Sequence, residues 1–127
     1  MAEGNSGPGY AAHPGHRVVL LREARRVTVV FGGETIADST DVVTVREADY
    51  PPVHYLPRRD VAMAHLARTS HTTYCPFKGK AAYFSLSVAG QEAANAVWSY
   101  ETPYDEVVGL KERVAFYPSK VDAITVG

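Results

Sequence analysis

The segment Thr73–Tyr83 places two reactive kinds of side chain on one short turn. Its sequence is Thr-Tyr-Cys-Pro-Phe-Lys-Gly-Lys-Ala-Ala-Tyr, in which Cys75 and Lys78 are three residues apart. Proline and glycine favour turns, so this segment can direct a thiol and an ammonium group at one point. The segment is compatible with a binding pocket, a transferase centre or a purely structural turn.

Cys75 has a chemical and a structural interpretation. A nucleophilic thiol needs a nearby base or cation that favours the thiolate, and Lys78, His71 or His54 would supply one. The alternative is that Cys75 is a small buried apolar residue. Cys75 and Lys78 are therefore the catalytic candidates if the protein is an enzyme.

Lys78 has three interpretations. It would hold a carboxylate or phosphate, form a Schiff base, or pair with the carboxylate of Asp60 or Glu101. Arg58 is either an anion clamp or a solvated neighbour of Asp60. Both cations are candidates for the charged end of a ligand site.

Aromatic side chains form a second group of candidates. Tyrosine accounts for 8 of the 127 residues, and several tyrosines lie beside prolines, which favour sheet edges. These rings would line one cleft with inward hydroxyls, or fill a small β core, and we favour the cleft for two or three of them. With the two cations, the ligand-binding candidates are Tyr55, Arg58, Lys78, Tyr83, Trp98 and Tyr100.

The histidines give a weaker indication of a metal site. His71 lies four residues before Cys75, and a further histidine, His65 or His54, would add a third ligand. The paired Cys-x-x-Cys hooks of structural zinc sites do not occur in the sequence. We therefore expect no metal and no cofactor.

The elements that position these residues are mostly strands. Residues 1–16 are rich in small residues and proline, so we expect a disordered tail followed by a single domain over residues 17–127. Gly32-Gly33 indicates a two-residue hairpin turn between β-branched runs. Strands are expected over residues 18–21, 27–31, 34–38, 42–45, 81–88, 97–100, 113–117 and 123–126.

The middle of the chain departs from this pattern. The prolines of Tyr50–Pro57 exclude helix and favour an extended or edge segment. After Pro57 the apolar spacing predicts one short helix near residues 59–68. The predicted fold class is mainly β, at the margin of α+β, as a compact antiparallel sandwich, an open barrel or a β-tent-like domain.

Composition limits the function classes. The chain has 127 residues and is 46% hydrophobic, which suits one core. Its 13 basic and 14 acidic side chains nearly cancel, and no apolar stretch approaches the roughly 20 residues of a membrane-spanning helix. A single cysteine cannot form an internal disulfide, and the first sixteen residues lack the apolar run of a secretory signal. We expect a cytoplasmic protein that binds neither nucleic acid nor membrane.

Three spaced elements combine the aromatic residues with the Cys75–Lys78 turn. They are Tyr50-Pro51 with Tyr55-x-Pro57-x-x-Asp60-Val61, Thr73-x-Cys75-Pro76-x-Lys78-Gly79-x-Ala81-x-Tyr83, and Ala96-x-Trp98-Ser99-Tyr100-x-x-Pro103. Together they resemble the uncharacterised domain family DUF427, over about Arg17 to Phe116. The resemblance implies a small, mainly β domain with no settled activity. Nucleotidyltransferase chemistry would call for an Asp-x-Asp pair or a Walker-type loop, and the sequence has neither.

Two functions of different classes follow. The first is a small-molecule-binding domain whose aromatic cleft takes an aromatic or anionic ligand, with Lys78 or Arg58 at the anionic end. The second is a small enzyme in which Lys78 or Cys75 does covalent or acid–base chemistry of a transferase or hydrolase type. A weaker alternative is an oligomerising domain that pairs its sheet edges into a homodimer. We favour the binding domain.

Overall fold

The computed structural model describes residues 4–127, and residues 1–3 of the expected tail lie outside the described part. Its strands are β1 (Val18–Glu23), β2 (Val27–Phe31), β3 (Glu34–Ser39), β4 (Val42–Glu47), β5 (Val53–Tyr55), β6 (Leu66–Cys75), β7 (Gly79–Val88), β8 (Gln91–Tyr100), β9 (Val114–Phe116) and β10 (Ala123–Val126). Its helical elements are α1 (Pro8–Ala12) and the 3₁₀ turns η1 (Arg58–Asp60), η2 (Met63–His65), η3 (Asp105–Leu110) and η4 (Pro118–Lys120).

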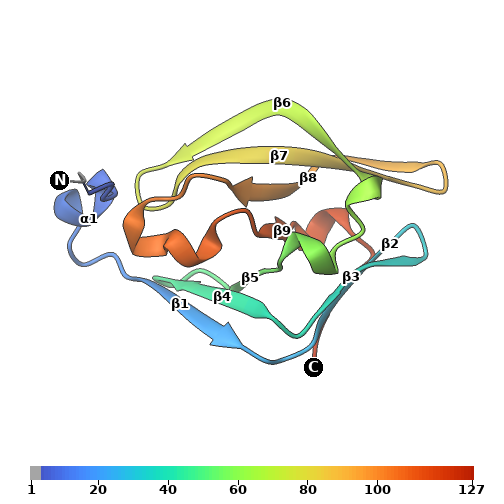
Figure 1. The fold of residues 1–127 in the computed structure, drawn as a ribbon, viewed down its shortest axis with the longest axis horizontal. Coiled ribbons are helices and arrows are strands. Elements are labelled where there is room, and N and C mark those ends of the chain that lie inside the picture. The colour runs from blue at the N-terminus through green and yellow to red at the C-terminus, as the bar shows by residue number, and fades with distance from the viewer. Residues whose placement is uncertain (1–3) are drawn as a thin grey trace.

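The strands form three antiparallel sheets, with the orders β1-β4-β5, β10-β2-β3 and β6-β7-β8-β9. Figure 1 shows β6, β7 and β8 on one side of the fold and β1 to β4 on the other, so the sheets lie in two layers. Leu56 and Val114 exchange backbone hydrogen bonds of 2.9 Å and thereby join the layers between β5 and β9. The predicted mainly β, antiparallel fold class is confirmed, and within residues 4–127 the sheets do not close into a barrel.

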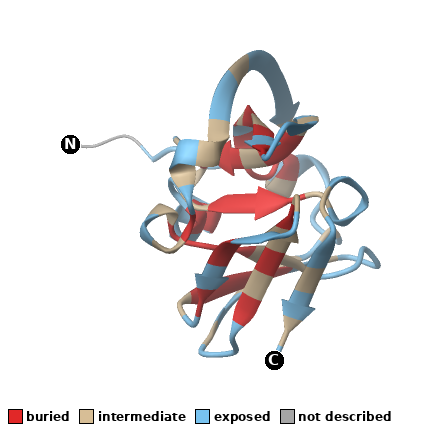
Figure 2. Cartoon of the chain, turned by 90° about the vertical axis from the view of Figure 1, so that its right-hand side faces the viewer, coloured by how far each residue is buried: buried red, intermediate tan, exposed pale blue. Residues whose placement is uncertain are grey.

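The core follows from the alternation of apolar residues along the strands. In β2 the side chains of Val27, Val29 and Phe31 point inward, and all three are buried. Figure 2 shows the buried residues on the strands in the middle of the fold, whereas β6 at its top is mostly exposed. Burying a valine or phenylalanine side chain contributes roughly 1.5–3 kcal/mol, so this face of β2 is a main source of stability.

The predicted Gly32-Gly33 hairpin is confirmed. Both glycines have positive φ, 62° and 78°, as a two-residue turn of this kind requires. A Cβ atom on Gly32 would lie 3.0 Å from the Val88 side chain, so glycine also allows the turn to approach the end of β7.

The short helix expected near residues 59–68 forms instead as two separate 3₁₀ turns, η1 and η2. They are interrupted because Val61 has an extended backbone and bridges Ala37 of β3. The Ala62 N–H donates to the carbonyl of Ile36 at 2.8 Å, so β3 takes the hydrogen bond that a helix would have used. Of the apolar residues that suggested a helix, Val61, Met63 and Leu66 still reach the core, and β6 begins at Leu66.

The expected disordered tail covers residues 1–16, but its described part, residues 4–16, packs against the domain. The Tyr10 hydroxyl donates to the Phe77 carbonyl at 2.9 Å, and the two rings meet edge to face at 5.1 Å. A Cβ atom on Gly9 would lie 2.8 Å from the Phe77 ring, so this glycine permits the close approach of α1. Small residues, which suggested disorder, here allow a tight backbone contact.

Asp41, which follows β3, connects three arginines from distant parts of the chain. Its carboxylate accepts hydrogen bonds from Arg22 at 3.0 Å, from Arg113 at 3.1 Å and from Arg59. The hydrogen bonds from Arg59 and Arg113 lower the pKa of Asp41 to about 2. Arg113 is only 11% exposed at its side chain, so this pair is the best shielded of the three.

Asp41→Asn is expected to lower the free energy of unfolding by about 1–2 kcal/mol at neutral pH, because Arg113 loses a charged acceptor that is partly shielded from water. Because the folded-state pKa of Asp41 is depressed, its contribution is present above about pH 4 and is lost as the pH falls toward 2. Urea unfolding at several pH values measures both effects. Asp38→Asn, which removes an exposed pair with Arg26, is the control; equal effects of the two variants would contradict this prediction.

Candidate functional site

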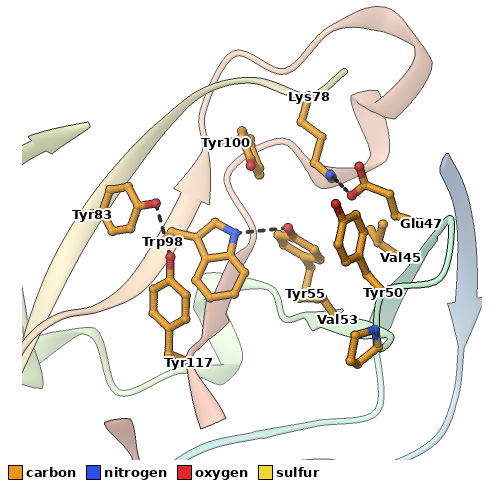
Figure 3. Close-up of a pocket in the computed structure, with 11 residues that line it drawn as sticks. Val45, Glu47, Tyr50, Val53, Tyr55, Lys78, Tyr83, Trp98, Tyr100 and Tyr117 are labelled. Atoms are coloured by element: carbon orange, nitrogen blue, oxygen red, sulfur yellow. Dashed lines mark hydrogen bonds and ion pairs between the residues drawn. The ribbon is translucent and has the colours of Figure 1, made fainter. Parts of the chain in front are cut away.

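A cavity of ≈ 240 Å³ opens between the two layers, beside the Cys75–Lys78 turn. We call it the tyrosine cavity, because five tyrosines contribute to its wall. Figure 3 shows its lining side chains converging from β4, β5, β7 and β8, from the turn between β6 and β7, and from the segments that follow β4 and β9. The lining residues are Val45, Glu47, Tyr50, Pro51, Val53, Tyr55, Lys78, Tyr83, Trp98, Tyr100 and Tyr117.

Strand register explains why the aromatic residues meet. Tyr83 of β7 is paired with Trp98 of β8, so their side chains lie on the same face of the sheet. Tyr100 is two residues beyond Trp98 and faces the same way, since side chains alternate along a strand. Five of the six ligand-binding candidates therefore line the tyrosine cavity: Tyr55, Lys78, Tyr83, Trp98 and Tyr100.

Hydrogen bonds and ring contacts hold the aromatic wall in place. The Trp98 indole N–H donates to the Tyr55 hydroxyl at 3.1 Å, and the Trp98 and Tyr117 rings lie 4.4 Å apart. The hydroxyls of Tyr83 and Tyr117 are 3.3 Å apart. Burial raises the pKa of Tyr55, and it raises the pKa of Tyr117 to about 12. Both hydroxyls are thus protonated near neutral pH.

The Tyr100 hydroxyl stands out in this wall. Tyr100 is 8% exposed and lines the tyrosine cavity, but its hydroxyl has no hydrogen-bond partner among residues 4–127. Burial raises its pKa, so the group remains an O–H donor. The hydroxyl is open to the cavity, where water or a ligand can accept its hydrogen bond.

A buried ion pair forms the polar end of the tyrosine cavity. The Lys78 ammonium donates to Glu47 Oε1, and His16 Nε2 lies 2.7 Å from Glu47 Oε2 (Figure 3). The side chains of Lys78 and Glu47 are only 8% and 17% exposed. Burial tends to raise the pKa of Glu47, but the hydrogen bonds and charges of Lys78 and His16 outweigh it, so the net shift is downward.

Comparison with known proteins identifies the family of the chain. A family model described as a domain of unknown function, DUF427, matches residues 19–127. The chain belongs to the DUF427 family. No curated protein matches the chain. The matched region contains every lining residue of the tyrosine cavity, whereas His16 lies just before it.

The carboxylate that pairs with Lys78 in this DUF427 domain is not one of those expected. Asp60 accepts a hydrogen bond from Ser39 at 2.7 Å, and Glu101 pairs with Arg58 at 3.0 Å, so the expectation of either as the partner is wrong. Glu47 is 31 residues from Lys78 in sequence. The signal that could have found it is the inward alternation of β4, where Val45 and Glu47 share a face.

Arg58 lies outside the tyrosine cavity of this DUF427 domain. Its guanidinium donates to the Glu112 carbonyl at 2.7 Å and to the Ser99 hydroxyl at 2.9 Å, in addition to its pair with Glu101. Arg58 therefore holds the end of β8 against the segment before β9. Arg58 and Lys78, both expected at the charged end of the ligand site, therefore lie in different places, and only Lys78 lines the cavity.

Cys75 also lies outside the tyrosine cavity. It ends β6, is paired with Gly79 of β7, and is partly buried against the cluster that contains Tyr55 and Tyr83. The histidines named as its bases contact other groups: His54 bonds the Thr44 hydroxyl at 2.9 Å, and His71 packs against the Tyr83 ring. The turn thus directs Lys78, but not Cys75, into the cavity.

The sequence did not indicate every residue that lines the tyrosine cavity. Tyr117 was expected only as part of a closing strand, and it reaches the cavity because its ring packs on Trp98. Within residues 4–127 there is no group of three or more His, Cys, Asp or Glu side chains that could hold a metal ion. The described helices include none long and apolar enough to cross a membrane.

Proposed function

We propose that this DUF427 domain binds a small molecule in the tyrosine cavity. The observation that carries the proposal is the convergence of five tyrosines, Trp98 and Lys78 on one cavity. A cavity of about 150 Å³ is enough to accept benzene. The ≈ 240 Å³ of the tyrosine cavity therefore suits one substituted aromatic ring.

The polar groups favour a ligand with acceptor oxygens. Both oxygens of Glu47 are engaged, one by Lys78 and one by His16. The groups left to a ligand include several donors, among them the Tyr100 hydroxyl and the remaining N–H groups of Lys78. A carboxylate or a carbonyl on the ring would accept from them, and a charged acceptor gives the stronger hydrogen bonds.

The enzyme alternative has less support. As the cationic partner of an ion pair, Lys78 serves as an anchor, whereas a Schiff base requires its neutral amine. The thiol of Cys75 does not line the cavity and so does not reach a ligand there. A buried lysine–glutamate pair beside a cavity is nevertheless the feature that an acid–base enzyme would use. The two functions differ in whether a bound aromatic acid is altered.

Tyr100→Phe is expected to weaken the binding of an aromatic acid about 3- to 10-fold, which corresponds to one lost hydrogen bond. Benzoate is a suitable probe, and the fluorescence of Trp98, the only tryptophan, reports its binding. Tyr74→Phe removes a hydroxyl at the surface and Cys75→Ser changes a residue outside the cavity, so neither should alter the affinity. Absence of saturable binding across a panel of aromatic acids would refute the proposal, and chemical conversion of a bound acid would favour the enzyme.

A further inference from the structure

We propose that the ligand of the tyrosine cavity is amphipathic: an aromatic acid that carries a small branched alkyl group, which enters a second cavity next to Trp98. This inference rests on the proposed function and names the class of ligand more closely. It is carried by the walls that the two cavities share and by the chemistry of the second one.

The second cavity, which we call the apolar cavity, measures ≈ 70 Å³ and lies between β2, β5, β9 and β10. Its deepest walls, Val27, Val29 and Leu56, are each 1% exposed. It is recessed below the surface, and its lining residues are mostly apolar. The lining residues are Val27, Val29, Pro52, Val53, His54, Leu56, Trp98, Phe116, Pro118 and Ile124.

The two cavities are neighbours. Trp98 and Val53 line both of them, so the two spaces adjoin at these side chains. Pro51 lines the tyrosine cavity and Pro52 the apolar cavity, so the segment before β5 runs along both openings. A ligand that follows this segment can keep its acid at Lys78 and place a substituent beyond Trp98.

Size and polarity decide what the substituent is. The apolar cavity has about half the volume of one that accepts benzene, so it fits an alkyl group of three or four carbons rather than a second ring. His54 is the titratable residue in its wall; its Nδ1 is engaged by Thr44, and burial lowers its pKa, which favours the neutral ring. Apart from the second ring nitrogen of His54, the side chains of these residues offer no free partner to a charged or strongly polar substituent.

The experiment compares benzoate with 4-isopropylbenzoate, using Trp98 fluorescence and calorimetry on the full chain. Burying the three added carbons should raise the affinity roughly 10- to 50-fold. The polar analogue 4-carbamoylbenzoate should show no such gain. If benzoate binds in a Tyr100-dependent way but the isopropyl group adds less than about twofold, the amphipathic ligand is refuted while the proposed function stands. If neither acid binds, both proposals fail.

Ile124→Phe tests whether the isopropyl group raises the affinity by entering the apolar cavity. Ile124 is partly buried on β10 and lines only the apolar cavity, so a larger ring there should abolish the advantage of the isopropyl group and leave benzoate affinity unchanged. Thr125→Phe places the same ring on the exposed face of β10 and should preserve the gain. An equal gain in both variants would place the alkyl group elsewhere and overturn the inference.

A methyl NMR titration of the unmodified chain gives an answer that does not depend on the folding of a variant. The methyl signals of Val29 and Ile124 should shift with 4-isopropylbenzoate and stay in place with benzoate. Shifts of equal size with both acids would also overturn the inference.

Discussion

Lys78→Met is expected to lower the free energy of unfolding by about 2–4 kcal/mol, because it leaves the half-buried Glu47 carboxylate without its cationic partner. The value lies below that of a fully enclosed pair because His16 still contacts Glu47. The same variant should weaken benzoate binding by about 1.5–3 kcal/mol through the loss of a charged donor. Urea unfolding and fluorescence titration measure the two effects separately.

Two controls show whether the ion pair is responsible. Lys80→Met changes an exposed lysine at the start of β7, two residues after Lys78, and should leave the free energy of unfolding within about 0.5 kcal/mol of the original. Adding Glu47→Gln to Lys78→Met should recover part of the loss, because the unpaired charge is then absent. The same loss in the single and double variants would mean that the methionine disturbs packing and that the pair is unimportant.

The pair also predicts a dependence on pH. The folded-state pKa of Glu47 is lowered, so its contribution to stability is present near neutral pH and is lost as the pH falls below the ordinary glutamate value of about 4.3. This acid-dependent loss should be smaller in the double variant, which lacks the carboxylate. Unfolding curves collected between neutral pH and pH 3 compare the two chains.

Phe77→Ala is expected to lower the free energy of unfolding by about 3 kcal/mol, as is typical of a buried phenylalanine. The ring contacts Tyr10 edge to face and stacks on His16 at 4.1 Å, so part of its stabilisation depends on the N-terminal segment. Deleting residues 1–16 should therefore cost more than about 1 kcal/mol and should reduce the additional effect of Phe77→Ala.

The measurement is a double-mutant cycle of the deletion and Phe77→Ala, read by urea unfolding. Tyr74→Ala, which removes an aromatic ring that is 60% exposed, is the matched control and should cost little in either background. A deletion with no effect on stability, together with strict additivity, would support the disordered tail that the composition suggested.

Most strands were predictable because their signals are local, but β6 was not, since a helix and a turn were expected over parts of Leu66–Cys75. Alternation and β-branched residues mark β2 and β7, and the Gly32-Gly33 turn fixes the register of β2 with β3. The two 3₁₀ turns near residues 59–68 were not predictable, because the apolar spacing of this segment suits one continuous helix equally well. What decides the outcome is a backbone hydrogen bond from Ala62 to Ile36, a tertiary contact that local spacing does not reveal.

The candidate site divides in the same way. Trp98 and Tyr100 could be assigned to one wall because their spacing matches the two-residue period of a strand, whereas Tyr83 joins them through the pairing of β7 with β8. The partner of Lys78 could not be assigned, since Glu47 comes from the opposite layer and any of several carboxylates would have satisfied the charge. Residues 4–16 were missed because their contacts depend on backbone approach at Gly9 and on one aromatic ring, which composition does not measure.

Glu47 links the tyrosine cavity to the N-terminal segment, because its two oxygens contact two different parts of the molecule. One oxygen holds Lys78 at the tyrosine cavity, and the other holds His16 at the end of the N-terminal segment. Any ligand that changes how firmly Lys78 holds this carboxylate also changes how firmly the carboxylate holds His16, and the coupling must act equally in both directions. The protease sensitivity of the N-terminal segment is therefore expected to report on occupancy of a cavity that the protease itself never reaches.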